Sequence, residues 1–500
     1  MPKAKWQGRR DGPVALGLWA LAAAVRLLFL FGHGDQEYPF SVFYYGDSRV
    51  YREFALAILD GRAYDSGLPF HPPLFAWVMA GAIDAVGARP ALIRALLALV
   101  GALAVPLTYL LGVRLLGRAP VAVGALLATF SFALCVAAVS PNAEVVYVPL
   151  LVGQALATVA LGASLAGDGR SRRRWIALAV ATGALAGLGA LTRAEHLAFL
   201  ALVPAALFIA RKRDGLRRTF AASAVVAATG MAVVAPWTFR NRGAIAHFNA
   251  EHPGLAEALP TFVPVTSYGA LNFALANHPD AQGGFDPLPL VGERGSGVDL
   301  LDPRQLDLYL HGYRRGLAAL AASPGRALRL AGAKLAIAAD AFALGFGTAD
   351  RPAELAGLRR PVDLFAPASR VLLPFALGLT AAGAWLARRQ ARPGAVVWLT
   401  ALLKALVCVA FFGYVRLFAQ LLPFAFLLQG RALMAAAGLL PGPRLRRALA
   451  AAGVGVALLL MAELAAGVAA PRNYVVSGSS DARGKIIQNA ALTITPTPRQ

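Results

Sequence analysis

Residues 13–31 read PVALGLWALAAAVRLLFLF, and the interpretation of the whole fold starts from this stretch. Its length is close to the roughly 20 apolar residues that a helix needs to cross a bilayer. Four basic residues precede it, and no convincing cleavage site follows it before the next polar segment. Because basic residues mark the cytoplasmic end of a membrane helix, we interpret the run as a retained signal anchor with residues 1–12 in the cytoplasm.

The composition of the whole chain is that of an integral membrane protein. Of its 500 residues, 58% are hydrophobic and only 15% are charged, which exceeds the apolar content of soluble domains. The formal net charge of +22 does not indicate a nucleic-acid partner, because the basic residues fall in short clusters between apolar runs. Cys135 and Cys408 lie inside apolar runs, so the sequence implies neither a disulfide framework nor a cysteine-based metal site.

Eleven apolar runs are long enough to be counted as membrane spans. They cover residues 13–31, 91–111, 119–139, 144–165, 175–191, 195–210, 219–236, 366–386, 394–412, 417–437 and 448–469. The sequence therefore predicts an all-α polytopic membrane protein with about 11 transmembrane helices.

Clusters of arginine between the spans predict the orientation. They occur at 114–118, 170–174, 211–218, 388–392 and 444–447. Placing all of them in the cytoplasm leaves two large loops, 32–90 and 237–365, on the outer face. This divides the chain into an N-terminal transmembrane module (13–236), the second loop, C-terminal transmembrane helices (366–470) and an extracytoplasmic tail (471–500).

Two further apolar stretches, 71–88 and 327–347, lie inside these loops. Counting either one alone as a crossing would move every later arginine cluster to the outer face, against the charge rule. We therefore expect both to be interfacial or re-entrant helices. The second stretch also carries arginine and lysine among its alanines and leucines, which is typical of an interfacial helix.

The first external loop contains the stretch Tyr44-Tyr45-Gly46-Asp47-Ser48-Arg49-Val50-Tyr51. Apolar residues recur at helical spacing from Val50 onward, and they predict a helix that ends at Gly61. Asp47 immediately precedes this helix, so it is either an N-cap, a catalytic carboxylate, or both.

Other ionisable residues also map to the outer ends of the predicted spans: His71, Glu144, Arg193, Arg240 and Arg416. Each has a simpler interpretation. Glu144 caps a helix, each arginine extends to lipid headgroups, and His71 starts an interfacial helix. Their convergence on one side nevertheless favours a functional site. Guanidinium groups bind phosphate through paired hydrogen bonds, and a carboxylate beside them is suited to take a proton from a hydroxyl.

Several short motifs together resemble one known family. They are Gly46-Asp47 with Tyr51, His71-Pro72-Pro73-Leu74, Pro141 to Glu144, Leu191-Thr192-Arg193, Pro236-Trp237-Thr238 with Arg240-Asn241, Leu271-Asn272-Phe273 with Asn277, Gly283-Gly284, and Tyr414 to Arg416. In this order the chain is similar, over about residues 10–440, to GT-C glycosyltransferases that use polyprenyl-phosphate sugars. The protein O-mannosyltransferases and the lipid A aminoarabinose transferases look most similar.

The resemblance implies a GT-C fold and an inverting membrane glycosyltransferase. Its donor is expected to be a sugar linked to polyprenyl phosphate, and its acceptor a hydroxyl of a lipid, glycan or protein on the outer face of the inner membrane. Asp47 maps to the general base and Glu144 to a second carboxylate. Arg193, Arg240 and Arg416 map to the phosphate contacts.

The substrate-binding candidates also include His71, Tyr51 and Asn241 from the matched motifs, and Arg49 from the first external loop. The resemblance has two departures: Asp47 is followed by Ser48 where the eukaryotic mannosyltransferases carry a second acid, and His71 stands where the lipid A transferases carry a Glu-Lys-Pro sequence. The departures concern the donor sugar and the acceptor more than the reaction. No cofactor is implied, and a divalent metal is compatible with the sequence without being required by it.

A polytopic transporter or flippase of lipid-linked glycans is the alternative from another class. It predicts charged residues in mid-span and paired broken helices, whereas most polar residues here lie in the two outer loops. Lys404 and Arg26 are the exceptions, because both lie inside apolar runs.

Overall fold

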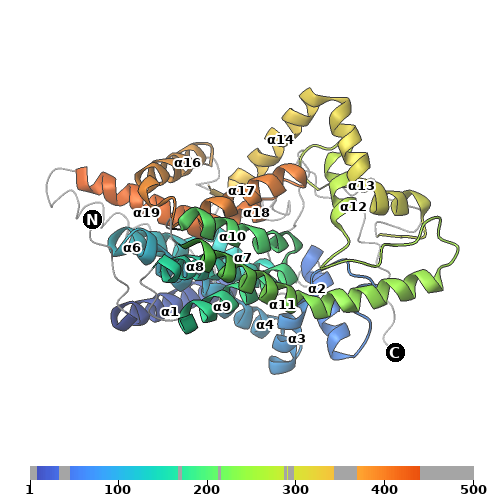
Figure 1. Cartoon of the computed structure of the whole chain (residues 1–500), viewed down its shortest axis with the longest axis horizontal. Helices are drawn as coiled ribbons and strands as arrows, with labels where there is room; N and C mark the ends of the chain where they lie inside the picture. The colour runs from blue at the N-terminus through green and yellow to red at the C-terminus, as the bar shows by residue number, and fades with distance from the viewer. Residues whose placement is uncertain are drawn as a thin grey trace.

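A computed structural model describes residues 8–32, 46–166, 172–211, 215–285, 290, 298–342 and 369–439. These residues form helices and no strand, so the all-α prediction is confirmed for them. The predicted span at 448–469 and the tail from residue 471 lie outside the described residues. Figure 1 shows an elongated bundle with a second group of helices at one end.

The bundle is built mainly from the N-terminal half of the chain. Its helices are α1 (Gly8–Gly32), α4 (Pro90–Ala102), α5 (Ala104–Leu115), α6 (Arg118–Phe130), α7 (Phe132–Val139), α8 (Glu144–Ala166), α9 (Arg172–Thr192), α10 (Phe199–Ala210) and α11 (Leu216–Glu251). The C-terminal half adds α16 (Ser369–Leu386), α17 (Ala395–Ala410), α18 (Val415–Ala419) and α19 (Leu422–Leu439).

Both predicted external loops contain helices. The first loop holds α2 (Gly46–Leu59), a 3-10 turn η2 (Tyr64–Gly67) and α3 (Leu74–Val86). The second holds α12 (Gly269–Asn277), α13 (Pro303–Ala322) and α14 (Pro324–Ala339). Short 3-10 turns also occur at η3 (Ala194–Ala198), η6 (Asp340–Phe342) and η8 (Arg388–Gln390).

Five stretches in the described part are long and apolar enough to cross a membrane, and a bent pair makes a sixth. The five are Asp11–Leu30, Pro90–Leu115, Glu144–Ala166, Arg172–Thr192 and Leu216–Glu251. The bent pair corresponds to the predicted span 119–139, where α6 and α7 meet at 63°. These stretches make the fold that of a multi-pass membrane protein. The remaining apolar helices of the described part are shorter than a bilayer span, so the structure does not confirm the predicted number of 11 crossings.

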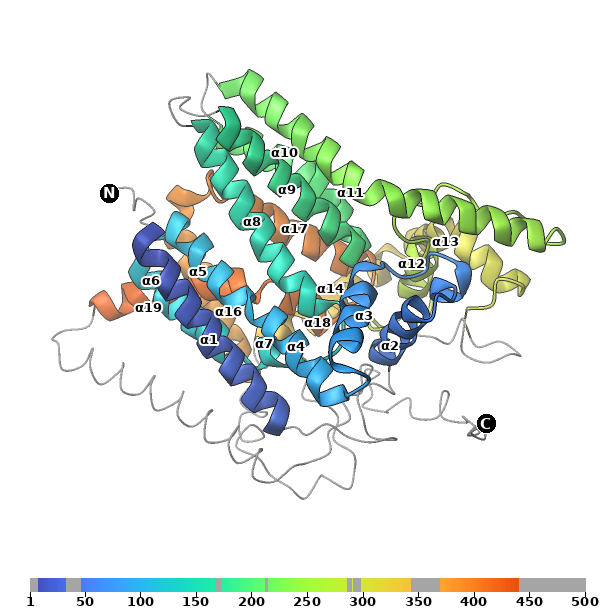
Figure 2. The same cartoon turned by 90° about the horizontal axis from the view of Figure 1, so that it is seen from below.

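Two predicted helix boundaries are wrong. The helix of the first loop begins at Gly46 and not at Val50, so Asp47 lies in its first turn and not at the N-cap. The span predicted to end at residue 236 continues as α11 to Glu251, with Pro236 inside it. Figure 2 shows α11 running along the bundle and extending beyond it to the loop helices. A proline removes only one helical hydrogen bond, and packing on both sides of Pro236 preserves the helix.

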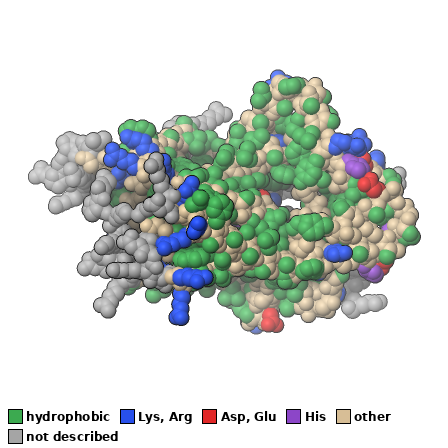
Figure 3. Space-filling model, viewed as in Figure 1, with side chains coloured by type: hydrophobic (Ala, Val, Ile, Leu, Met, Phe, Trp, Pro, Cys, Tyr) green, Lys and Arg blue, Asp and Glu red, His purple; other side chains and the backbone are tan. Residues whose placement is uncertain are grey.

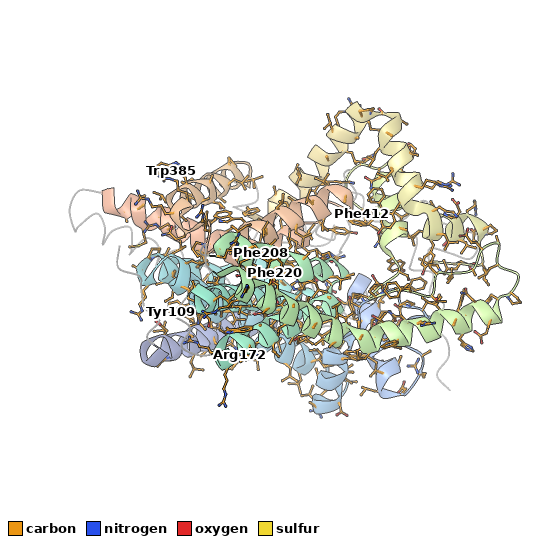
Figure 4. All side chains as sticks on the ribbon, in the orientation of Figure 1. Tyr109, Arg172, Phe208, Phe220, Trp385 and Phe412 are labelled. Carbon is orange, nitrogen blue, oxygen red and sulfur yellow. The ribbon has the colours of Figure 1, made fainter. Side chains whose placement is uncertain are left out.

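The basic side chains gather at one end of the bundle. Successive helices run in opposite directions, so the end of α5, the start of α6, the start of α9 and the start of α11 meet at one end. The arginines there include Arg114, Arg118, Arg172 and Arg217. Figure 3 shows blue side chains concentrated at this end, and Figure 4 shows Arg172 projecting away from the ribbon. The start of α8 and the end of α9 consequently lie at the opposite end.

Helix α9 packs closely on α11 through two glycines. A Cβ atom at Gly183 would lie 2.5 Å from the carbonyl oxygen of Val226, and one at Gly187 would lie 2.6 Å from the Cβ of Val233. The small-residue spacing in the sequence predicted this close packing, and the structure confirms it.

We expect Gly183→Ala to lower the thermal stability of the detergent-solubilised protein. The added methyl group meets the backbone of α11, and overpacking of this kind costs about 1–3 kcal/mol. Gly17→Ala is the matched control, because nothing lies within 4 Å of its Cβ position on α1 and alanine is the better helix former. A thermal-shift measurement that gives both variants the same midpoint would contradict the packing argument.

Candidate functional site

Arg193 lies between two carboxylates at the end of the bundle opposite the basic clusters. Its Nη1 donates to Glu144 Oε1 at 2.5 Å, and its Nε donates to Glu195 Oε1 at 2.6 Å. Glu144 is the first residue of α8, and Arg193 and Glu195 lie at the turn from α9 to η3. Three helix ends are thus held together through one guanidinium.

Lys404 reaches this group from the middle of α17. Its Nζ donates to Glu195 Oε1 at 3.1 Å and to the Tyr147 hydroxyl at 3.0 Å. The Tyr147 hydroxyl also lies 2.9 Å from Nδ1 of His196. We call Glu144, Tyr147, Arg193, Glu195, His196 and Lys404 the Arg193 network.

The members of the network differ in their access to solvent. Lys404 and His196 are completely buried, and Glu144 is 2% exposed, whereas the side chain of Arg193 is 20% exposed. The hydrogen bonds of Arg193 to other described residues use Nε and Nη1, which leaves Nη2 without a partner in the described part of the chain. Arg193 therefore keeps one donor group for a ligand.

The charge of Arg193 is secure in this position. Burial by itself lowers the pKa of Arg193, but the charges of Glu195 and Glu144 outweigh burial and raise the pKa above its ordinary value. The positive charge of Arg416 acts against this rise, so Arg416 lies close enough to interact with Arg193. Arg416 is half-buried on α18 with its guanidinium 4.7 Å from the ring centre of Tyr414. Two guanidinium groups near each other are typical of an anion site.

Helix α2 is attached beside the Arg193 network. The Ser48 hydroxyl donates to Asn142 Oδ1 at 3.1 Å, and Asn142 is two residues before Glu144. The backbone of Asp47 and Arg49 flanks Ser48 in the first turn of α2, while their side chains lie outside the described residues. The backbone thus brings the two predicted catalytic residues, Asp47 and Glu144, to neighbouring segments.

His71 is held by a carboxylate that sequence reasoning missed. Asp65 Oδ2 accepts the backbone N–H of His71 at 2.7 Å and lies 3.0 Å from its Nδ1. Asp65 has a left-handed backbone with φ of 53°, which is uncommon for a residue other than glycine. The ring of His71 lies 6.1 Å from Tyr51 on α2 and 5.3 Å from Tyr268. Because Asp65 holds Nδ1, Nε2 is the ring nitrogen of His71 that has no hydrogen-bond partner among the described residues.

Tyr64 completes the packing of the first loop. Its hydroxyl donates to the carbonyl oxygen of Pro72 at 3.1 Å, and its ring lies 4.8 Å from Phe54. Burial, followed by the neighbouring Tyr51 and Asp65, raises the pKa of Tyr64 well above its ordinary value. The phenol therefore remains a neutral hydrogen-bond donor.

Arg240 and Asn241 are adjacent on α11, but their side chains contact different parts of the protein. The guanidinium of Arg240 stacks 4.8 Å from the ring centre of Trp237 and donates to the carbonyl oxygen of Tyr64 at 3.0 Å. Asn241 is completely buried, and its Nδ2 donates to the carbonyl oxygens of Val263 and Val265 at 3.0 and 3.1 Å. We therefore assign Asn241 to holding this loop on α11 and not to direct ligand contact.

One apolar cluster joins the first loop to the Arg193 network. It contains Tyr51 and Phe75 from the first loop, Val146 from α8, Leu191 from α9 and Trp237 from α11. The candidate residues of the two groups thus share a single packed support.

The sequence named six residues that lie in or beside these groups: Glu144, Arg193, His71, Tyr51, Arg240 and Arg416. It missed Asp65, Tyr147 and His196, and it treated Lys404 as an exception. The short separation of Arg193 and Glu195 in the sequence could have indicated their ion pair, because both lie at the turn predicted between the spans 175–191 and 195–210. Among the described residues, no group of three or more histidine, cysteine or acidic side chains is arranged to hold a metal ion.

Comparison with known proteins gives a family match over part of the chain and a similar fold. Residues 70–239 match the family model described as dolichyl-phosphate-mannose-protein mannosyltransferase. The apo crystal structure of the Archaeoglobus fulgidus oligosaccharyltransferase is similar with a TM-score of 0.51 and 15% identity, over 94% of this chain and 57% of that one. The chain thus spans little more than half the length of that protein. No curated protein matches the chain.

Two ligand-bound structures are also similar. AglB from Archaeoglobus fulgidus, in complex with an inhibitory peptide and a dolichol-phosphate, has a TM-score of 0.51 at 14% identity, over 95% of this chain and 57% of that one. ArnT from Cupriavidus metallidurans, bound to undecaprenyl phosphate, has a TM-score of 0.36 at 18% identity, over 86% of this chain and 79% of that one. From the family match and the archaeal fold, the resemblance to the GT-C glycosyltransferases is confirmed, and the chain has the GT-C fold.

Proposed function

We propose that this protein is an inverting glycosyltransferase that moves a sugar from a polyprenyl-phosphate donor to an acceptor hydroxyl on the extracytoplasmic face of the membrane. The observation that carries the proposal is the placement of Arg193. A charged guanidinium is fixed by Glu144 and Glu195, and it keeps Nη2 unbonded within the described part of the chain, with Arg416 nearby. Such a group is suited to an anionic phosphate.

The nature of the donor follows from chemistry and from the similar proteins. A phosphate bound to a long prenyl chain has one charged end and one apolar end, which suits a cationic group at the end of a membrane helix bundle. AglB from Archaeoglobus fulgidus, which has a similar fold, was solved in complex with a dolichol-phosphate. The family model is itself described by a dolichyl-phosphate sugar. We therefore assign the same lipid class to this chain.

A single displacement accounts for the transfer. The acceptor oxygen attacks the anomeric carbon of the sugar, and its proton passes to the Asp47 carboxylate. The bond from the anomeric carbon to the phosphate oxygen breaks, and the electron pair leaves with the polyprenyl phosphate. Arg193 and Arg416 stabilise the charge that develops on that phosphate. Because attack and departure occur on opposite sides of the carbon, the configuration inverts.

The first loop supports the donor and acceptor in this scheme. Asp47 and Tyr51 are four residues apart on α2, so they share one face of the helix, and the Tyr51 ring packs against that of His71. We assign the Nε2 edge of His71 and the guanidinium of Arg240 to substrate contact at this face. We also assign Tyr51 and Arg49 to substrate contact, with Arg49 starting from another side of α2 because it is two residues from both Asp47 and Tyr51.

The transporter alternative loses its main support. It rested on charged residues in mid-span, and Lys404 was the clearest of these. Lys404 bonds to Glu195 and Tyr147, so it belongs to the network at the helix ends and does not mark a separate path through the bilayer.

We expect Asp47→Asn to abolish sugar transfer while leaving membrane insertion intact. The amide cannot accept the proton of the acceptor hydroxyl, and loss of a general base typically lowers a rate by about 10²–10⁴-fold. Asp60→Asn is the matched control, because Asp60 follows the other end of α2 and is 56% exposed in a pair with Arg62. Transfer is measured with a radiolabelled polyprenyl-phosphate sugar in purified membranes. Near-normal turnover by the Asp47 variant would remove it from the base role.

We expect cysteine labelling from the outside to distinguish the two ends of the bundle. An impermeant maleimide should label Thr261→Cys, which is exposed beside the first loop, and should not label Arg392→Cys at the basic end. The native Cys135 and Cys408 are buried and provide the unlabelled background. Labelling of the Arg392 variant in sealed cells, with the Thr261 variant protected, would reverse the proposed orientation.

A further inference from the structure

Glu144, Glu195 and Arg193 carry an excess of negative charge that Lys404 compensates. Two carboxylates, Glu144 and Glu195, surround one guanidinium, so these three groups alone sum to one negative charge. A phosphate approaching Arg193 would meet that surplus charge at short range. In a partly buried site such a charge is weakly screened, and it opposes the attraction that Arg193 and the neighbouring Arg416 exert on the phosphate.

Lys404 supplies the compensating positive charge from the buried side of Glu195. Its ammonium is completely buried, 3.1 Å from Glu195 Oε1, and it lies 4.4 Å from the ring centre of Tyr147. The Arg193 guanidinium lies 5.7 Å from the centre of the same ring. The two cations are thus separated by Tyr147 and share Glu195. With Lys404 included, the four charges sum to zero.

We propose that Lys404 is a positioning residue for the phosphate contact: it neutralises Glu195, and this permits Arg193 to bind an anionic ligand while both carboxylates hold it. The inference rests on the proposed function, because the anionic ligand is the phosphate of the donor. It also explains why a lysine occurs in the middle of an apolar helix, where its burial is costly.

A second buried lysine provides the matched control. Lys334 on α14 is 1% exposed and also contacts α17, but its partners are neutral: Nζ donates to Asn277 Oδ1 at 2.8 Å and to the carbonyl oxygen of Val409 at 3.0 Å. Lys334→Met removes a buried ammonium without changing the charge of the Arg193 network. Any loss that results from disturbed packing alone should appear in this variant as well.

The test compares the binding of undecaprenyl phosphate with that of undecaprenol by the purified protein in detergent. The ratio of the two dissociation constants isolates the phosphate and is insensitive to general stability. We expect the wild type to prefer the phosphate, Lys404→Met to lose this preference by about tenfold or more, and Lys334→Met to retain it. Glu195→Gln leaves a surplus positive charge, so we expect its preference to exceed that of the wild type.

Charge restoration provides a further check. The double variant Glu195→Gln, Lys404→Met returns the network to neutrality, and we expect it to recover the preference that Lys404→Met loses. If Lys404→Met does not fold, the opposite sign expected for Glu195→Gln still decides the matter.

Three results would overturn the inference. The first is that Lys404→Met retains the preference for the phosphate. The second is that both lysine variants lose this preference equally. The third is that Glu195→Gln binds the phosphate no better than the wild type. A wild-type protein that binds both lipids equally overturns the donor assignment as well, so failure of the proposed function is distinguished from failure of the role of Lys404.

Discussion

The buried ion network around Arg193 is the interaction on which the arrangement of the bundle ends depends. A charged group in an apolar protein is tolerated only when its partners are fixed, and removing one partner of a buried pair typically costs about 3–5 kcal/mol. Glu144 begins α8, Arg193 follows the end of α9, and Lys404 lies on α17. Arg193 bonds to Glu144, and both Arg193 and Lys404 bond to Glu195. These bonds therefore fix how α8, α9 and α17 meet, and they also fix the geometry of the site.

The first loop depends on this junction from the outside. Ser48 bonds to Asn142 next to Glu144, and the apolar cluster that contains Tyr51 extends to Leu191 beside Arg193. Asp65 in turn orients His71. The described part of the first loop is packed on the same support as the charged residues, which suits a site whose groups are held within narrow limits.

Hydrophobic pattern and charge predicted the architecture because membranes constrain both strongly. The placement of Glu144 and Arg193 at the end of the bundle opposite the arginine clusters followed from the alternation of these clusters with the apolar runs. The length of α11 was not predictable from hydropathy, since its last turns leave the apolar run and are supported by the loop that Asn241 binds. Asp65 was missed because its role depends on a left-handed backbone, which no local pattern indicates.

Lys404 illustrates why partners are harder to predict than positions. In the sequence it is a lone cation in an apolar run, and it favoured a transporter. Its acceptors, Glu195 and Tyr147, are 209 and 257 residues away, so no spacing rule connects them. Once they are connected, the same residue argues for the opposite conclusion: a cation that balances two carboxylates behind an arginine has a use where an anion must bind, and it needs no path across the bilayer.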